Sequence, residues 1–410
     1  MVTQQISIEF EATPVLSYAM AHNEIPAISR LRIDGVAADV RAATLRLTVA
    51  DAQGPIGDPQ DVLLDLAAGE PTVLSDLTLV LDPAAMLQVE EQRPGTIRAE
   101  LVIGGEVVAE QVVRIRVLAA GQWLATPPAL ALELLAAHVL PNHPAVGALL
   151  EEVAERLRAG TGSPSIQGYQ AGPERVDQIV AAVFAAVQAR GIRYAEPPAS
   201  WADTGQKVRT PGEVLEGRVG TCLDLVLTLA AALELAGIRP LLWLVPGHAF
   251  LGWWREEASL GSVVEFDPTG VANRVDLGQQ GLVETTAVTT STAYAEACRI
   301  PVAEHLSGDL AVLGIVDVQQ ARADRIVPLP ARTRGPDGAV HVTVYQPAAP
   351  AAATGAPPAP ADGAGTRPRP EPPRVSPWKN ALLDLSLRNR LINLTRRSAL
   401  SLAVPDGGPA

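Results

Sequence analysis

Cys222 is the residue whose setting in this sequence points most directly to chemistry. It follows a Gly-Thr turn in the stretch GRVGTCLDLV, residues 217–226, and opens an apolar run that predicts a buried helix closed by Gly237. A thiol attacks a carbonyl carbon only as the thiolate, so its free pKa of about 8.5 has to be lowered. A helix N-terminus favours negative charge, and Thr221 is the expected cap. The pattern predicts a nucleophilic cysteine.

A histidine and an aspartate further along the chain could complete such a site. His248 lies in WLVPGHAFLGWW, where it opens a predicted strand after a Pro-Gly turn. Asp267 lies in VVEFDPTG, at the end of the next predicted strand. An imidazole can exchange a proton with a thiol when an acceptor on its far nitrogen orients the ring. The sequence therefore predicts a Cys–His–Asp triad built from a helix start and two neighbouring strands.

The three motifs GTCLDL, PGHAFLGWW and EFDPTG, in this order, resemble those of the transglutaminase-like superfamily over about residues 125–300. This resemblance implies a papain-like core, in which a helix that carries Cys packs on a sheet that carries His and Asp. It implies Cys222 as nucleophile, His248 as general base and then general acid, and Asp267 as the residue that orients the imidazole.

Members of this superfamily often place an upstream Gln, Trp or Tyr near the oxyanion. Gln206, Trp201 and Tyr194 are the candidates here, and the sequence does not choose among them. The backbone N–H of Cys222 is an additional expected oxyanion donor, because it lies at a helix start.

Each triad residue also has a purely structural interpretation. Cys222 could be a small buried apolar side chain, His248 a histidine satisfied at a sheet edge, and the DPTG stretch at Asp267 a common turn. The order of the three, each at the border of an element, favours the functional interpretation. Cys298 lies on a predicted helix without a motif, and we expect it to be structural.

Two further features near the motifs are expected to support structure. Asp224 could cap the helix start or pair with an arginine. The neighbouring Trp253 and Trp254 are expected to pack rather than to hold a substrate.

The predicted chemistry is acyl transfer through a thioester. Water as the acceptor makes the protein a peptidase or amidase acting on a protein or peptide, and this is the interpretation that we favour. A lysine-type amine as the acceptor would make a crosslinking transglutaminase. A third alternative is a binding or sensor module without catalysis. No calcium-loop pattern and no CxxC spacing for zinc occurs, so we expect neither a metal nor a cofactor.

The chain divides by pattern into four segments. Residues 1–118 alternate apolar and polar residues in short strands, which predicts an antiparallel, immunoglobulin-like β-sandwich. Residues 119–345 mix helical and strand patterns and are expected to form an α+β, transglutaminase-like domain. Residues 346–375 are rich in Ala and Pro and predict a disordered linker. Residues 376–410 predict an amphipathic helix at the start of a further domain.

The stretch SPWKNALLDLSLRNRLINLT in the last segment resembles the region that precedes the motor of large bacterial superfamily 1 helicases. The resemblance implies that the chain is a fragment, in which a protease-like head precedes an ATP-driven nucleic-acid motor. By analogy it suggests a role in defence against foreign DNA. Arg388, Arg390, Arg396 and Arg397 could equally form the solvated face of an ordinary helix.

Composition narrows the class of protein. The net charge of −13 argues against a general nucleic-acid-binding surface, so nucleic acid is expected only through the downstream part. Two cysteines cannot form a disulfide framework, which favours a reducing compartment. The N-terminus lacks the pattern of a secretion signal, and charges or prolines interrupt every long apolar run. We therefore expect a soluble, cytoplasmic protein without a membrane partner.

Overall fold

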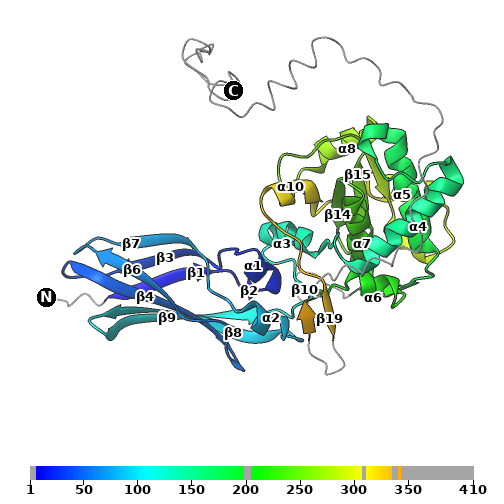
Figure 1. Ribbon diagram of the computed structural model, residues 1–410. Coiled ribbons are helices and arrows are strands. Elements are labelled where there is room, and N and C mark those ends of the chain that lie inside the picture. The colour runs from blue at the N-terminus through cyan, green and yellow to red at the C-terminus, as the bar shows by residue number, and fades with distance from the viewer. Residues whose placement is uncertain (1–5, 198–204, 307–310, 335–339, 343–410) are drawn as a thin grey trace, which may run out of the picture. The chain divides into compact units, whose positions relative to one another are not determined.

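The computed structural model of this chain describes residues 6–197, 205–306, 311–334 and 340–342. Residues up to 345 belong to one compact unit. The predicted linker at 346–375 and the predicted helix within 376–410 lie outside the described residues. The described chain is mixed α/β and contains several sheets, among them antiparallel ones (Figure 1).

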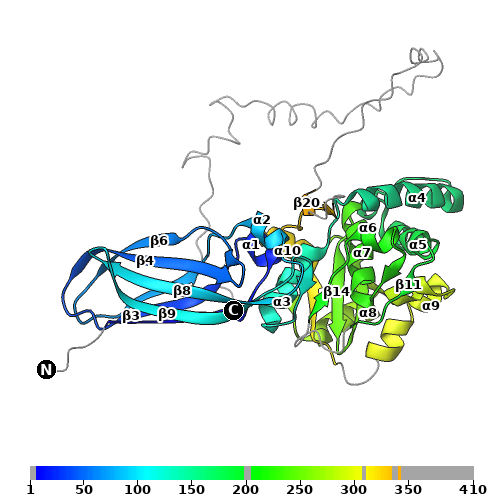
Figure 2. The ribbon, with the colours of Figure 1, turned by 90° about the horizontal axis from the view of Figure 1, so that it is seen from below.

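The N-terminal part consists of strands in which buried and more exposed residues alternate. In β4 (Val40–Asp51) Ala43, Leu45, Leu47 and Val49 are buried while the residues between them are more exposed, as a strand with one covered face requires. One sheet has the order β1-β3-β7, and the other has the order β2-β9-β8-β4-β5 with β6 paired to β4. Figures 1 and 2 show these sheets as two layers, and their buried side chains belong to a common core.

The remaining strands of this part are short or follow turns. A Gly-Gly turn joins β8 to β9, where Gly104 and Gly105 have φ of 62° and 89°. Two short helices, α1 and α2, interrupt the strands. The bounds are β1 (Ser7–Ala12), β2 (Val15–Leu16), α1 (Tyr18–His22), β3 (Ile28–Asp34), β5 (Gly54–Pro55), β6 (Gln60–Leu66), β7 (Thr72–Leu77), α2 (Pro83–Leu87), β8 (Arg93–Ile103) and β9 (Glu106–Val117).

A five-stranded sheet forms the centre of the second part. Its order is β16-β18-β14-β15-β17, and every neighbouring pair is antiparallel. The central β14 is buried at every position, because helices cover it. The bounds are β14 (Pro240–Val245), β15 (His248–Trp254), β16 (Val264–Glu265), β17 (Gln280–Val283) and β18 (Gly314–Asp317).

Helices form where apolar residues recur at helical spacing. Helix α5 covers most of the apolar-periodic stretch 174–191, and the helix predicted to begin at Cys222 is α7. Glycines follow both helices with positive φ, 63° at Gly191 and 74° at Gly237. The helix bounds are α3 (Pro128–Leu135), α4 (Pro144–Thr161), α5 (Pro173–Gln188), α6 (Pro211–Leu215), α7 (Cys222–Leu235), α8 (Pro268–Asp276), α9 (Tyr294–Ala297) and α10 (Val318–Ala323).

Helix α7 lies at the centre of this part. It contacts β14 and β15 on one side and α4, α5 and α6 on others, as Figures 1 and 2 show. Twelve of its residues are buried, so a helix that is apolar on nearly every face is the expected sequence. Short strand pairs flank it: β10 (Gln122–Trp123) with β12 (Gln206–Lys207), β11 (Arg193–Tyr194) with β13 (Val219–Gly220), and β19 (Arg332–Arg334) with β20 (Val340–Val342).

The order of the strands differs from the sequence-based expectation in one respect. We expected the strand after β15 in sequence to lie next to it, but β18 and β14 separate β16 from β15. The neighbour of β15 on its other side is β17, which comes later in the chain. Among the described residues, no helix combines the length and apolar character that crossing a membrane requires.

Candidate active site

Cys222 is the first residue of α7, as its sequence setting predicts. Thr221 is the N-cap: its Oγ1 accepts the N–H of Asp224 at 3.2 Å, and the carboxylate of Asp224 accepts the N–H of Thr221 at 3.0 Å. This reciprocal capping box fixes the start of the helix. The thiol is therefore held at the end of the helix where the macrodipole favours negative charge.

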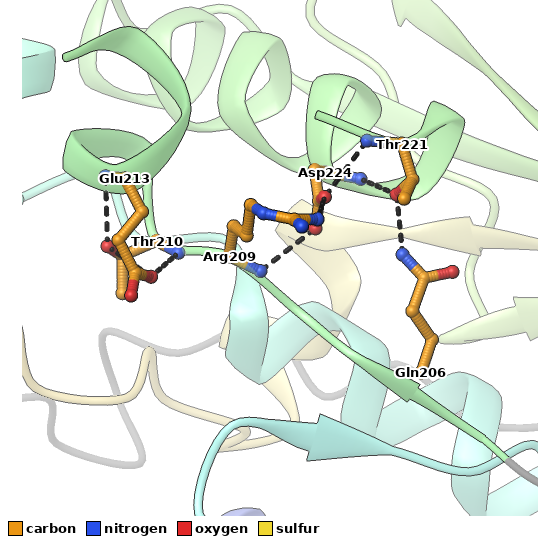
Figure 3. Close-up of polar contacts among 6 residues, drawn as sticks. All are labelled: Gln206, Arg209, Thr210, Glu213, Thr221 and Asp224. Carbon is orange, nitrogen blue, oxygen red and sulfur yellow. Dashed lines mark hydrogen bonds and ion pairs between the residues drawn. The ribbon is translucent and has the colours of Figure 1, made fainter. Parts of the chain in front are cut away.

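Asp224 anchors this helix start to the preceding loop. Its side chain is completely buried and accepts hydrogen bonds from the Arg209 guanidinium at 2.8 Å and from the Arg209 N–H at 2.9 Å (Figure 3). Both roles expected for Asp224, helix cap and partner of an arginine, are confirmed. A buried carboxylate is tolerated here because donors surround it.

His248 begins β15 directly after the turn at Pro246 and Gly247, where Gly247 has φ of 74°. Its Nε2 lies 2.7 Å from Oε2 of Glu284, and its ring also hydrogen-bonds the side chain of Cys222. Since Glu284 occupies Nε2, the ring nitrogen left to face the thiol is Nδ1. The structure thus brings Cys222 and His248 together and adds Glu284 behind the imidazole.

The charges around His248 favour its protonated form. Burial alone lowers the pKa of His248, but hydrogen bonds to Cys222 and Glu284, together with their negative charge, raise it to about 10. For Glu284, burial acts to raise the pKa, and the bonds from His248 and from Thr286 outweigh this and lower it. The N–H and hydroxyl of Thr286 donate to Oε1 of Glu284 at 2.8 and 2.6 Å. Both carboxylate oxygens are therefore engaged, and the carboxylate is fixed in place.

The prediction that Asp267 orients His248 does not hold in this structure. Asp267 is exposed and caps α8, where its side chain accepts the N–H of Thr269 at 3.0 Å. Hydrogen bonds from the side chain of Thr269 and then from its N–H lower the pKa of Asp267. The physical reason is the strand order, since Asp267 follows β16, and two strands, β18 and β14, lie between β16 and β15. Glu284 follows β17, the direct neighbour of β15, and takes the place expected for the aspartate.

Glu284 was not among the residues singled out from the sequence. Its local stretch, QQGLVETT, offers a short apolar run followed by an acid and two threonines. That pattern signals the cap of the 3-10 helix Thr285–Thr289, which Glu284 does provide. Nothing local in it signals a partner 36 residues upstream.

Tyr194 and Gln206, two of the three oxyanion candidates, lie at the start of α7. Tyr194 pairs with Gly220 between the parallel strands β11 and β13, and its hydroxyl donates to the side chain of Cys222. Burial, followed by the negative charge and hydrogen bond of Cys222, raises the pKa of Tyr194 to about 12. Gln206 is buried, and its Nε2 donates to Oγ1 of Thr221 at 2.5 Å (Figure 3). The third candidate, Trp201, lies outside the described residues.

The thiol is closed off from solvent. Cys222 has an exposed fraction of 0%, whereas Tyr194, which contacts it, is 45% exposed. A substrate carbonyl can reach the sulfur only after a covering group moves. Within the described ranges, no three or more His, Cys, Asp or Glu side chains converge as ligands for a metal ion.

Cys298, Trp253 and Trp254, which we expected to be structural, have the surroundings of structural residues. Cys298 follows α9, and burial, partly offset by a hydrogen bond from Tyr294, raises its pKa to about 11. Trp253 and Trp254 are both buried among core side chains, so they pack rather than present a surface.

Comparison with known proteins gives no family. No family model matches the chain, and no curated protein matches its sequence. Among solved structures, a candidate protease from Parabacteroides distasonis ATCC 8503 is 11% identical, with 71% of this chain and 70% of that chain covered and a TM-score of 0.21.

Two further solved structures match smaller parts of the chain. A beta-glucuronidase from Bacteroides uniformis is 15% identical, with 27% of this chain and 12% of that chain covered and a TM-score of 0.19. The periplasmic chaperone SfaE is 15% identical, with 30% and 60% covered and a TM-score of 0.18. This chain spans less than a fifth of the length of the first glycosidase structures that it matches. At these TM-scores the likenesses carry no inference about activity.

Proposed function

We propose that the second part of the chain is a transglutaminase-like cysteine hydrolase that cleaves amide or peptide bonds through a thioester. The observation that carries the proposal is the line of Cys222, His248 and Glu284, with Glu284 2.7 Å from Nε2 of the imidazole. A nucleophile at a helix start, a base against it and an acceptor behind the base are the three parts that acyl transfer needs. Glu284 replaces Asp267 in this proposal.

Each of the three residues has a step to perform. The Cys222 sulfur attacks the amide carbonyl, and the carbonyl π electrons move to oxygen. His248, protonated at Nδ1, gives this proton to the departing amine as the C–N bond breaks and the thioester forms. It then takes a proton from water, whose oxygen attacks the thioester, and returns that proton to sulfur as the acid leaves. Glu284 accepts the Nε2–H throughout and stabilises the imidazolium.

The oxyanion of the tetrahedral intermediate also needs donors. The N–H of Cys222 and the hydroxyl of Tyr194 lie at the sulfur, and we assign them this role. Gln206 is instead assigned to holding the N-cap, because its amide donates to Thr221. The same residues would serve whether water or an amine attacks the thioester. Crosslinking to an amine therefore stays the alternative within this chemistry.

One observation favours a second candidate function, a binding or sensor module without turnover. The sulfur is closed off from solvent, and a thiol that never opens would serve packing alone. The predicted nucleic-acid motor rests on the resemblance found within residues 376–410, which lie outside the described residues. It therefore stays a prediction under either function.

Labelling of the full chain at neutral pH separates the two candidates. An acyl-type thiol probe, such as a peptide thioester, is expected to modify Cys222 in the parent and in Cys298→Ala, which removes the other cysteine. Cys222→Ala is expected to abolish labelling, and His248→Ala to reduce it by at least about 100-fold. Equal labelling of the Cys222→Ala protein and the parent would refute the hydrolase, and a parent that is unreactive while folded would favour the binding module.

A further inference from the structure

The ring of His305 lies against His248 and has no part in the mechanism above. His305, in the π-helix Val302–Leu306, stacks on His248 with ring centroids 5.7 Å apart and planes 28° apart. It also stacks on Phe250, at 5.3 Å and 9°. His248 and Phe250 are two residues apart on β15 and share one face of the strand. One ring therefore covers two neighbouring side chains of that face.

The stack continues into the core. Phe250 lies against the buried Trp243 with centroids 5.5 Å apart and planes 19° apart. Offset aromatic stacks of this kind stabilise ring orientation in addition to burying area. His305 is thus the outer member of an array that rests on rigid β-strands, and it connects this array to the imidazole of His248.

A ring stacked on His248 can restrict one motion of its imidazole. Glu284 binds Nε2 and Cys222 interacts with the ring from the thiol side, which fixes two points on the edge of the imidazole. The ring turns about its Cβ–Cγ bond, a motion that would break both contacts, and a group stacked on a face of the ring opposes that motion. His305 covers a face, and a neutral aromatic face is also a favourable neighbour for an imidazolium.

We propose that His305 is the positioning residue of His248: its neutral ring holds the imidazolium in line with Cys222, and protonation of His305 disrupts that arrangement. The proposal rests on the proposed function, because it concerns the same imidazole. Protonated rings of His305 and His248, stacked at this distance, would repel each other.

The groups around His305 determine when it is protonated. Burial and then the positive charge of His248 lower the pKa of His305, and the carboxylates of Glu304 and Glu284 raise it in part. Glu304 lies on the same π-helix, while Glu284 faces the stack from the end of β17. The net shift of the His305 pKa is downward, so the ring is mainly neutral at pH 7 and gains its charge as the pH falls below the ordinary histidine value.

Two substitutions of His305 distinguish the effect of its ring from the effect of its charge. Both are tested in the full chain that also carries Cys298→Ala. His305→Phe keeps a planar ring that cannot be protonated, and His305→Ala removes the ring. The readout is the rate of Cys222 alkylation by iodoacetamide from pH 5 to 9. His305→Phe is expected to stay within about twofold of the parent at pH 7 and to retain more of its rate at pH 5. His305→Ala is expected to lose about tenfold at pH 7 through misalignment of His248.

A second measurement keeps the proposal independent of thiol reactivity. NMR titration of the His248 ring is expected to give a lower midpoint in His305→Ala than in the parent. Unchanged alkylation and an unchanged His248 midpoint in that variant would overturn the positioning role. A parent in which Cys222 is unreactive would count against the hydrolase alone, and the titration would then decide on His305. If His305→Ala does not fold, an acid profile of His305→Phe identical to that of the parent would overturn the proposal.

Discussion

The carboxylate of Glu284 accepts a hydrogen bond from an imidazole 36 residues upstream, with Oε2 of Glu284 2.7 Å from Nε2 of His248. The pairing of β15 with β17 brings them together. In that pair Leu251 lies opposite Val283, so the chain leaves β17 next to the beginning of β15, where His248 lies. Because the strands are antiparallel, the residue that ends β17 meets residues near the start of its neighbour.

Substitution of Glu284 tests the role that this pairing gives it. Glu284→Gln retains the shape but loses the charge that stabilises the imidazolium, and we expect acylation of Cys222 to fall by about 100-fold or more. The measurement is the second-order rate of labelling by the peptide thioester at neutral pH.

Asp267→Asn is the matched control for that substitution. Asp267 is exposed and only caps α8, and Asn is an equally good cap, so the labelling rate should stay within about twofold of the parent. If Asp267→Asn lost most of the labelling rate and Glu284→Gln lost none, the triad with Asp267 would be correct and the triad with Glu284 would be wrong.

Tyr194 has two effects on Cys222 that different probes can separate. Tyr194→Ala removes a side chain that contacts the buried Cys222, so we expect alkylation by the small reagent iodoacetamide to become faster. Tyr194→Phe keeps the ring and loses the hydroxyl, and we expect it to slow acylation by the peptide thioester by about 100-fold, as loss of an oxyanion donor does. A Tyr194→Phe protein that acylates at the parent rate would leave the Cys222 N–H as the proposed donor.

The pH dependence follows from the directions of the two shifted pKa values. The pKa of His248 is raised to about 10 in the folded protein. The stability that the bound proton provides is therefore complete below the pKa of the unfolded chain, about 6.5. It is lost as the pH rises through about 10. The pKa of Glu284 is lowered, so its contribution is complete above its unfolded value and is lost as the pH falls through the lowered value.

Comparison of the parent with His248→Phe across pH measures this linkage. The difference in unfolding free energy should be largest between about pH 5 and 6.5, should shrink steadily as the pH rises from there to about 10, and should also shrink as the pH falls below about 5. Acylation by the peptide thioester should decline on the alkaline side near pH 10. A decline centred near the unperturbed histidine value of about 6.5 would show that His248 does not hold the proton that the mechanism requires.

Local signals located Cys222 and His248, whereas a long-range pairing located Glu284. Thr221 and Asp224 form a capping box that is visible as a spacing of three residues, and a Pro-Gly turn precedes His248. Position of the acid depends instead on which strand lies beside β15. Chain order suggested β16, but β17 is only four residues long, and no periodicity in four residues distinguishes a strand from a loop.

The same distinction explains other parts of the fold. The apolar period of α5 and the Gly-Gly turn before β9 act over a few residues and could be predicted. In the stretch LGIVDVQQA the apolar residues are typical of a strand, but β18 ends at Asp317, which then caps α10. An aspartate at the end of an apolar run signals a helix start as readily as a turn, and only the tertiary structure decides between them.

The ion pair of Asp224 with Arg209 gives the last prediction, on stability. The Asp224 side chain has no solvent exposure, so loss of Arg209 leaves a buried carboxylate with backbone donors only. Arg209→Met is expected to lower the unfolding free energy by about 3 kcal/mol, measured by urea unfolding. The control is Glu257→Gln, which removes a surface ion pair between Arg239 and the largely exposed Glu257. It should lower the unfolding free energy by less than about 1 kcal/mol.

A double-mutant cycle shows whether that cost belongs to the pair. Asp224→Asn removes the charge that Arg209 neutralises and keeps an oxygen for the Thr221 N–H, so Arg209→Met should cost much less in its presence. We expect a coupling energy of about 1–3 kcal/mol. A coupling below about 0.5 kcal/mol would mean that the two side chains act independently. The helix start that carries Cys222 would then be held by its capping box and by Gln206 rather than by this ion pair.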